Sequence, residues 1–154
     1  MITLISNSTS DTKEIGNQLA HFLKKGDTIV LSGDLGAGKT MLVSGILSFY
    51  GKENDASSPT FTIVNEYTLT NDLKLFHFDV YRFNFEDEFL AMGGDEYFGR
   101  GICIIEWGEK ISDYLPSDYI KISITKDSAD ENKRTILIDS TGKKSEELLN
   151  KLSN

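Results

Sequence analysis

The feature that most constrains this chain is the stretch GDLGAGKT at residues 33–40. A glycine, four residues and then Gly-Lys-Thr is the spacing of a phosphate-binding loop, the P-loop or Walker A motif. Glycines allow backbone conformations that are closed to other residues, so successive N–H groups can surround phosphate oxygens. Lys39 supplies a point charge for the outer phosphates, and the hydroxyl group of Thr40 suits a magnesium ion. The stretch therefore predicts a site for a nucleotide phosphate.

The segments on either side of the loop have the patterns that a P-loop requires. Residues 27–33 are apolar and β-branched, which predicts a strand, and residues 39–50 carry an apolar face at helical spacing. Gly51 is a suitable C-terminal cap for that helix. The positive N-terminus of the helix would point at the phosphates. The order strand, loop and helix favours nucleotide binding over an accidental glycine-rich turn.

The rest of the chain alternates between strand and helix patterns. We expect further strands at 2–6, within 56–69, and at 74–83, 101–107, 118–126 and 133–140, and further helices at 8–26 and 145–152. Residues 84–99 look helical at first and then irregular. The short connection before 74–83 indicates an antiparallel pair. We therefore predict an α/β fold: a three-layer P-loop NTPase-like sandwich with a mixed, largely parallel central sheet, in a single domain spanning 1–154. If the strand at 2–6 runs parallel to 27–33, the loop at 7–10 opens beside the nucleotide.

Composition excludes several classes of function. The formal net charge is −8 and the chain holds three arginines, which argues against a protein that grips nucleic acid by its phosphates. No apolar run exceeds four residues, so we expect neither a membrane span nor a secretory signal. Cys103 is the only cysteine, so no disulfide can form within the chain, and the two histidines lack zinc-ligand spacing. These features predict a cytoplasmic protein.

Two carboxylates compete for the role of the acid that P-loop proteins place near magnesium. Asp79 ends the apolar stretch LFHFD, and Glu106 ends ICIIE. Either one alone is equally consistent with a strand-end carboxylate that faces solvent. The stretch SSPTFT, with Pro59 and Thr60, is either a plain turn or a segment whose hydroxyl groups sense the γ-phosphate.

Five stretches taken in order resemble the bacterial TsaE family of small ATPases, which support synthesis of threonylcarbamoyladenosine at the tRNA adenosine beside the anticodon. They are GDLGAGKT, SPTFTIVNEY, HFDVYR, GGDEYF and IEWGEK, and they span about half of the chain. The first stretch is common to many proteins, whereas the ordered set is specific. Met41 and the pair Gly93-Gly94 depart from the family pattern.

The resemblance implies ATP and Mg²⁺ as cofactors. It implies nucleotide contacts from Thr9, Gly33, Asp34, Leu35, Gly36, Ala37, Gly38, Lys39 and Thr40. It implies magnesium contacts from Thr40 and Glu106, and catalytic roles for Lys39, Thr60, Asp79 and Glu106, with Asp79 as the Walker B acid. It also implies that the partners are TsaD and TsaB, which fits an acidic chain that is poorly suited to hold tRNA directly. The acidic stretch at 86–96 is either a docking surface for them or a solvated face.

Three rival functions differ in what they require. A small-molecule P-loop kinase needs an arginine-bearing lid, and no arginine-rich segment follows the P-loop helix. A regulatory GTPase needs a base-reading Asn/Thr-Lys-x-Asp motif, and TKDS at 125–128 places the acid one residue early. A nucleotide-gated binding module differs from an ATPase only in whether turnover of the nucleotide matters for its function.

The only tryptophan, Trp107, directly follows Glu106. Successive side chains along a strand point to opposite faces, so we expect the indole of Trp107 to turn away from the Glu106 side. This places Trp107 where it senses a rearrangement of the site more than it touches the nucleotide.

Overall fold

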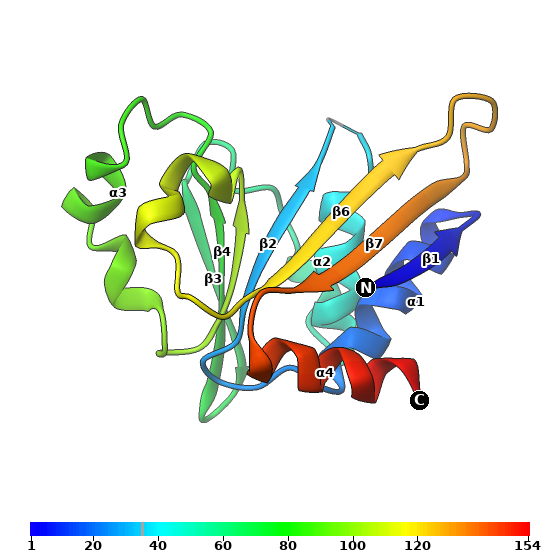
Figure 1. Cartoon of the computed structure of the whole chain (residues 1–154), viewed down its shortest axis with the longest axis horizontal. Coiled ribbons are helices and arrows are strands. Elements are labelled where there is room, and N and C mark those ends of the chain that lie inside the picture. Colours follow the sequence, from blue (N-terminus) through cyan, green and yellow to red (C-terminus); the bar gives the residue numbers. More distant parts are fainter. Residues whose placement is uncertain (35) are drawn as a thin grey trace.

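Seven strands form one sheet in the computed structural model, which describes residues 1–34 and 36–154. The strand order is β1-β7-β6-β2-β5-β4-β3 (Figure 1). The strands are β1 (Ile2–Ser6), β2 (Thr28–Gly33), β3 (Val64–Thr70), β4 (Leu73–Asp79), β5 (Ile102–Glu106), β6 (Ile120–Lys126) and β7 (Arg134–Ser140). The helices are α1 (Thr9–Ala20), α2 (Lys39–Ser48), α3 (Asp87–Ala91) and α4 (Lys143–Ser153), with short 3₁₀ segments at Glu53–Asp55, Gly94–Tyr97 and Gly108–Tyr114.

The predicted α/β fold with a mixed sheet is confirmed. The pairs β6–β2, β2–β5 and β5–β4 are parallel and consecutive, whereas β1–β7, β7–β6 and β4–β3 are antiparallel. Strands β1, β2, β4, β5 and β6 thus run in one direction, and β3 and β7 run in the other because the two short connections, β3 to β4 and β6 to β7, each form a hairpin. The antiparallel pairing of the strand after residue 72 with its predecessor is confirmed.

Two hydrophobic clusters fill the two faces of the sheet and give the three layers. The larger cluster joins α1, α2 and α4 to one face, and its largest fully buried members include Leu19, Leu42 and Ile46. The second cluster covers the other face of β4 and β5 with α3 and the 3₁₀ segments Gly94–Tyr97 and Gly108–Tyr114, which lie at the end of the molecule away from β1 (Figure 1). Cys103 belongs to this second cluster, and burial raises the pKa of its thiol to about 12. The cysteine is therefore a core residue.

Two elements, α1 and β4, end several residues earlier than predicted. Helix α1 stops at Ala20, and the chain then turns through Gly26, where the side chain of Asp27 accepts a hydrogen bond from the Lys24 N–H at 2.8 Å. Strand β4 stops at Asp79 because the carboxylate of Asp79 accepts the Tyr81 N–H at 3.0 Å and turns the chain away from the sheet. In the described part of the chain no helix is long and apolar enough to cross a bilayer.

The parallel strands bring three chain segments to one edge of the sheet. In the register of the sheet, Glu106 of β5 lies between Leu31 of β2 and Asp79 of β4. The loop after β2, the end of β5 and the end of β4 are therefore neighbours. Strand β1 runs in the same direction as β2, since it is antiparallel to β7 and β7 is antiparallel to β6. The segment after β1 thus opens at the same edge.

Candidate nucleotide-binding site

The loop between β2 and α2 takes a conformation that depends on its glycines. Gly36 has φ +77° and Gly38 has φ +114°, a region that residues with a Cβ atom rarely adopt. The Ala37 N–H donates to the Asp34 carbonyl oxygen at 2.9 Å, which tightens the turn. Gly38 precedes the first residue of α2 and offers no capping side chain. The loop and the positive end of α2 are thus arranged for an anion.

Arg134, at the start of β7, holds this loop from outside. Its Nε donates to the carbonyl oxygen of Ala37 at 2.9 Å, and its guanidinium reaches the Gly36 carbonyl oxygen at 3.5 Å. The same guanidinium donates to the carbonyl oxygens of Glu131 and Lys133 at 2.6 and 3.0 Å. With these carbonyl groups engaged by Arg134, the loop is fixed from its outer side.

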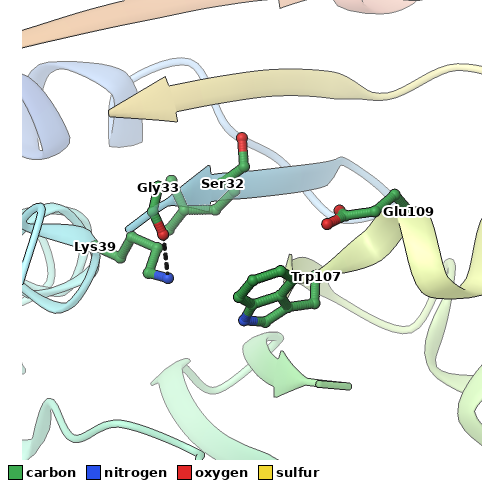
Figure 2. A pocket seen from close by; sticks show the side chains of 6 residues that line it. Ser32, Gly33, Lys39, Trp107 and Glu109 are labelled. Carbon is green, nitrogen blue, oxygen red and sulfur yellow. Dashed lines mark hydrogen bonds between the residues drawn. The ribbon is translucent and has the colours of Figure 1, made fainter. Parts of the chain in front are cut away.

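Lys39 is the first residue of α2, and its ammonium group contacts the ends of both β2 and β5. It donates to the Gly33 carbonyl oxygen at 2.6 Å and lies 3.3 Å from Oε1 of Glu106. Figure 2 shows the Lys39 side chain reaching Gly33, with the indole of Trp107 beside it. The ammonium nitrogen lies 5.8 Å from the centre of that indole, within range of a cation–π contact. Ser32 and Glu109 line the same small pocket of about 30 Å³ (Figure 2).

Glu106 is a buried carboxylate, 5% exposed, that bridges two partners. Its Oε1 faces Lys39, and its Oε2 lies 2.7 Å from Nε2 of His77 on β4. Burial by itself raises the pKa of Glu106, but the hydrogen bond from His77 and the charge of Lys39 outweigh it and hold the pKa below its ordinary value. Glu106 is therefore ionised at neutral pH.

Asp79 is also largely buried and links β4 to two loops. Besides holding Tyr81, its carboxylate lies 3.4 Å from Oγ1 of Thr60, which in turn lies 2.7 Å from Oγ of Ser58. The Asp79 N–H donates to the carbonyl oxygen of Ile63 at 2.8 Å, and Ile63 has φ +70°, a strained value for a β-branched residue. The loop at 58–63 is thus tied to the Asp79 end of β4.

A cleft of about 630 Å³ joins these groups. It is lined by Thr9, Gly36, Gly38, Lys39, Thr40, Met41, Ser58, Thr60, Asp79, Tyr81, Glu106 and Trp107. Its volume lies within the range of pockets that hold small ligands and cofactors, about 300–1,000 Å³. Most of the residues that the sequence singled out therefore line one cleft.

The remaining predicted residues lie around this cleft or outside the residues that the structure describes. Ala37 lines an adjoining cavity of about 100 Å³, together with Thr9, Gly36, Gly38 and Arg134. Gly33 lines the small pocket beside Lys39. Asp34 is exposed, and it contributes its carbonyl oxygen to the turn. Leu35 lies outside the described residues.

The oxygen atoms in the cleft fit a magnesium ion. The hydroxyl group of Thr40 and the carboxylates of Asp79 and Glu106 are hard ligands on one cleft. Among residues 1–34 and 36–154, no group of three or more His, Cys, Asp or Glu side chains is placed to hold a metal by itself. Magnesium in nucleotide sites binds through one or two protein ligands, phosphate oxygens and water, so such a group is not required. Thr40 and Glu106 would be the protein ligands.

Sequence reasoning missed three contributors and misjudged one. His77 and Tyr81 lie in the stretch HFDVYR, but the sequence suggested no role for either, and Arg134 lies in none of the five stretches. The prediction that Trp107 turns away from the Glu106 side was wrong, because Trp107 has φ +64° and leaves the strand. The indole consequently lines the cleft and packs on Tyr81 with ring centres 4.8 Å apart.

Comparisons with known proteins point to one family. The family model for the threonylcarbamoyl adenosine biosynthesis protein TsaE matches residues 6–136. A TsaE protein of Bacillus subtilis (strain 168) is 43% identical over 146 residues, covering 93% of this chain and 88% of that protein. A TsaE protein of Treponema pallidum (strain Nichols) is 38% identical over 121 residues, covering 78% of this chain and 88% of that protein.

A solved structure extends the likeness to the fold. The crystal structure of Bacillus subtilis YdiB superposes with a TM-score of 0.81 at 35% identity, covering 99% of this chain and 93% of that one. The match of fold and sequence extends well beyond the P-loop, which many unrelated proteins share. The chain belongs to the TsaE family of threonylcarbamoyl adenosine biosynthesis proteins.

Proposed function

We propose that this protein binds and hydrolyses ATP with Mg²⁺, and that this activity supports threonylcarbamoyladenosine modification of tRNA at the adenosine beside the anticodon. The observation that carries the proposal is the single cleft that joins Lys39, Thr40, Thr60, Asp79 and Glu106. The backbone of the loop and the N-terminus of α2 bind the phosphates, and Lys39 neutralises the outer ones. The magnesium ion supplies neutralisation of charge on the outer phosphates when it is bound.

The two carboxylates have different places in the cleft and hence different proposed roles. Glu106 has one oxygen held by His77 and the other turned to Lys39, which suits a fixed ligand at the phosphate end. Asp79 has oxygens near Tyr81 and Thr60, which suits orientation of a water molecule or of the loop at 58–63. Asp79 thus acts as the Walker B acid, and Thr60 reports on the outer phosphate.

Hydrolysis by the isolated protein should be slow because its arginines are engaged elsewhere. Arg134 holds the outer side of the P-loop, and Arg82 donates to the carbonyl oxygens of Thr60 and Phe61 at 3.4 and 3.2 Å. Arg100 lies over the rings of Phe76 and Tyr97. P-loop enzymes without a placed arginine turn over at well under about one per second. A partner is therefore proposed to complete the site or to order it.

The proposed partner is the TsaD–TsaB pair, with hydrolysis resetting that assembly between turnovers. A net charge of −8 disfavours strong direct binding of tRNA, so the protein acts through the transferase assembly. A small-molecule kinase is disfavoured, because in the described part of the chain no arginine lines the 630 Å³ cleft. A nucleotide-gated binding module stays the closest alternative.

The experiment measures ADP and inorganic phosphate from MgATP, with the protein alone and with added TsaD–TsaB pair. We expect a slow rate alone, a higher rate with the pair, and equal amounts of both products. Binding of ATP with no phosphate release in either case would favour the binding module. ADP without free phosphate in the presence of a small acceptor would favour a kinase. A full rate alone, with no response to the pair, would refute the role of the partner.

A further inference from the structure

His77 is a buried polar residue that contacts Glu106 and that takes no direct part in the proposed reaction. It lies on β4 with no exposed surface, paired in register with Ile104 of β5. Side chains alternate along a strand, so His77 and Asp79 project from the same face of the sheet. Its Nε2 lies 2.7 Å from Oε2 of Glu106. Within the described residues its other ring nitrogen, Nδ1, is buried and makes no hydrogen bond.

The unequal surroundings of the two nitrogens fix where the ring carries its proton. A proton on Nδ1 would be a buried donor without an acceptor, which costs free energy. A proton on Nε2 is donated to the carboxylate of Glu106 at a short distance. The ring therefore holds its proton on Nε2 and donates it to Oε2 of Glu106.

This hydrogen bond decides how Glu106 presents its carboxylate. With Oε2 engaged by His77, the free rotation of the carboxylate is lost, and Oε1 is the oxygen that faces Lys39 and the cleft. Leu75, which precedes His77 on the same face, and Ile104, which lies beside it, are apolar. Asn65, opposite His77 on β3, directs its amide to Ser57 and not to the ring. An apolar side chain would pack there without leaving a nitrogen unpaired. The contact with Glu106 is thus the chemical reason for a histidine at this position.

We propose that His77 is a positioning residue, which holds Glu106 in the orientation that binds magnesium through Oε1. The proposal rests on the proposed function, since it concerns the metal-bound nucleotide. Partners that orient a metal ligand typically change metal affinity by about 10- to 100-fold when they are removed. His77 is not expected to touch the nucleotide, because it is not one of the described residues that line the cleft.

The test compares His77→Phe with His77→Gln. Phenylalanine fills the space without a donor, whereas the amide of glutamine can place an N–H where Nε2 stands. The measured quantity is the dissociation constant of a non-hydrolysable ATP analogue, once with Mg²⁺ and once with EDTA. We expect His77→Phe to reduce the gain in affinity from Mg²⁺ by about tenfold. Affinity in EDTA should stay unchanged, and His77→Gln should recover most of the gain.

Ile104→Val is the matched control, since it removes one buried methyl group beside His77 and leaves the polar contacts intact. It should keep the full effect of Mg²⁺. An equal loss in Ile104→Val, or no loss in His77→Phe, would overturn the proposal while leaving the proposed function standing. Failure of the wild-type protein to bind the analogue, or to respond to Mg²⁺, would instead refute the proposed function and the inference with it.

If His77→Phe does not fold, the wild-type protein carries the test. In a ¹⁵N spectrum of the histidine rings, His77 should show a protonated Nε2 and an unprotonated Nδ1. The proton at Nε2 should exchange slowly with water, and its signal should move when Mg²⁺ is added to the complex with the analogue. The opposite tautomer, or a signal that Mg²⁺ does not move, would overturn the proposal.

Discussion

Replacing Lys39 by alanine tests the electrostatic arrangement of the cleft most directly. The ammonium group of Lys39 makes a 2.6 Å hydrogen bond to the Gly33 carbonyl oxygen and a 3.3 Å ion pair with Glu106. The two side chains of the pair are only 14% and 7% exposed. The contact is therefore screened less by water than a surface ion pair would be.

The loss of stability can be bounded from these contacts. Removing one partner of a fully buried ion pair costs about 3–5 kcal/mol, because an uncompensated charge remains. Here Glu106 keeps its hydrogen bond from His77, so the loss resembles that of a hydrogen bond to a charged group, about 1.5–3 kcal/mol. The Lys39→Ala protein should stay folded at neutral pH, with a free energy of unfolding lower by about this amount.

Nucleotide affinity should fall by a comparable free energy. A charge-assisted hydrogen bond to phosphate of about 1.5–3 kcal/mol corresponds to a dissociation constant larger by about 10- to 150-fold. The backbone N–H groups and the end of α2 remain. We therefore expect weak residual binding.

The stability difference should depend on pH with a definite sign. The folded pKa of Glu106 lies below its ordinary value of 4.5, so the unfolded chain binds more protons in that window. The stability from ionised Glu106 is thus complete above about pH 4.5 and is lost as the pH falls through the lower, folded pKa. In Lys39→Ala, where the charge of Lys39 is missing, ionised Glu106 contributes less to the free energy of unfolding. The gap in unfolding free energy between the wild type and Lys39→Ala should therefore narrow below about pH 4.5.

The assay is urea unfolding followed by circular dichroism at pH 7 and pH 3.5, combined with equilibrium dialysis of ATP at pH 7. Lys39→Arg is the control, since it keeps the charge at a changed geometry. A gap that does not narrow at low pH would show that Lys39 does not act on Glu106. An unchanged dissociation constant for ATP in Lys39→Ala would refute the assignment of Lys39 to the phosphates.

Three further predictions concern other parts of the molecule. MgATP should change the fluorescence of Trp107, which lines the cleft. Glu106→Gln should weaken the magnesium-dependent part of this fluorescence change more than Asp79→Asn does. The reverse order would exchange the roles of the two carboxylates. Gly38 has φ +114°, so Gly38→Ala should lower the free energy of unfolding by about 1–3 kcal/mol and weaken ATP binding in the same dialysis assay. A variant that binds ATP as tightly as the wild type would contradict the need for glycine at this position. Phe89→Ala should lower the free energy of unfolding, measured in urea, by about 3–5 kcal/mol, because Phe89 fills the second cluster. The folded variant should keep its affinity for ATP, since this cluster lies away from the cleft. A loss of stability below about 1 kcal/mol would contradict that packing.

The sequence was sufficient for those parts of the site that follow from local pattern. The glycine spacing at 33–40 predicts the loop, and the two apolar stretches that end in Asp79 and Glu106 predict strand-end carboxylates. The structure places both at one edge because β4 and β5 are parallel and in register. That pairing links residues 27 positions apart, so no local pattern reports it.

The parts that sequence reasoning missed depend on contacts between distant segments. Arg134 reaches Ala37 across 97 positions, and its role depends on β7 lying two strands from β2. The orientation of Trp107 depends on one positive φ value, which alternation along an extended strand does not predict. The sequence suggested no role for His77 because its partner, Glu106, lies 29 positions away.

The charges around the cleft explain why nucleotide and metal are expected to bind together. Lys39 is already paired with Glu106, and the guanidinium of Arg134 is directed at carbonyl oxygens on the outer side of the loop. A metal-free nucleotide would therefore have to draw Lys39 away and leave the carboxylate of Glu106 buried without its cation, beside its own negative phosphates. A nucleotide that arrives with a divalent cation gives Glu106 a replacement charge. Under the proposed function, the ion pair that stabilises the cleft before binding would thus disfavour the bare nucleotide and favour the metal complex.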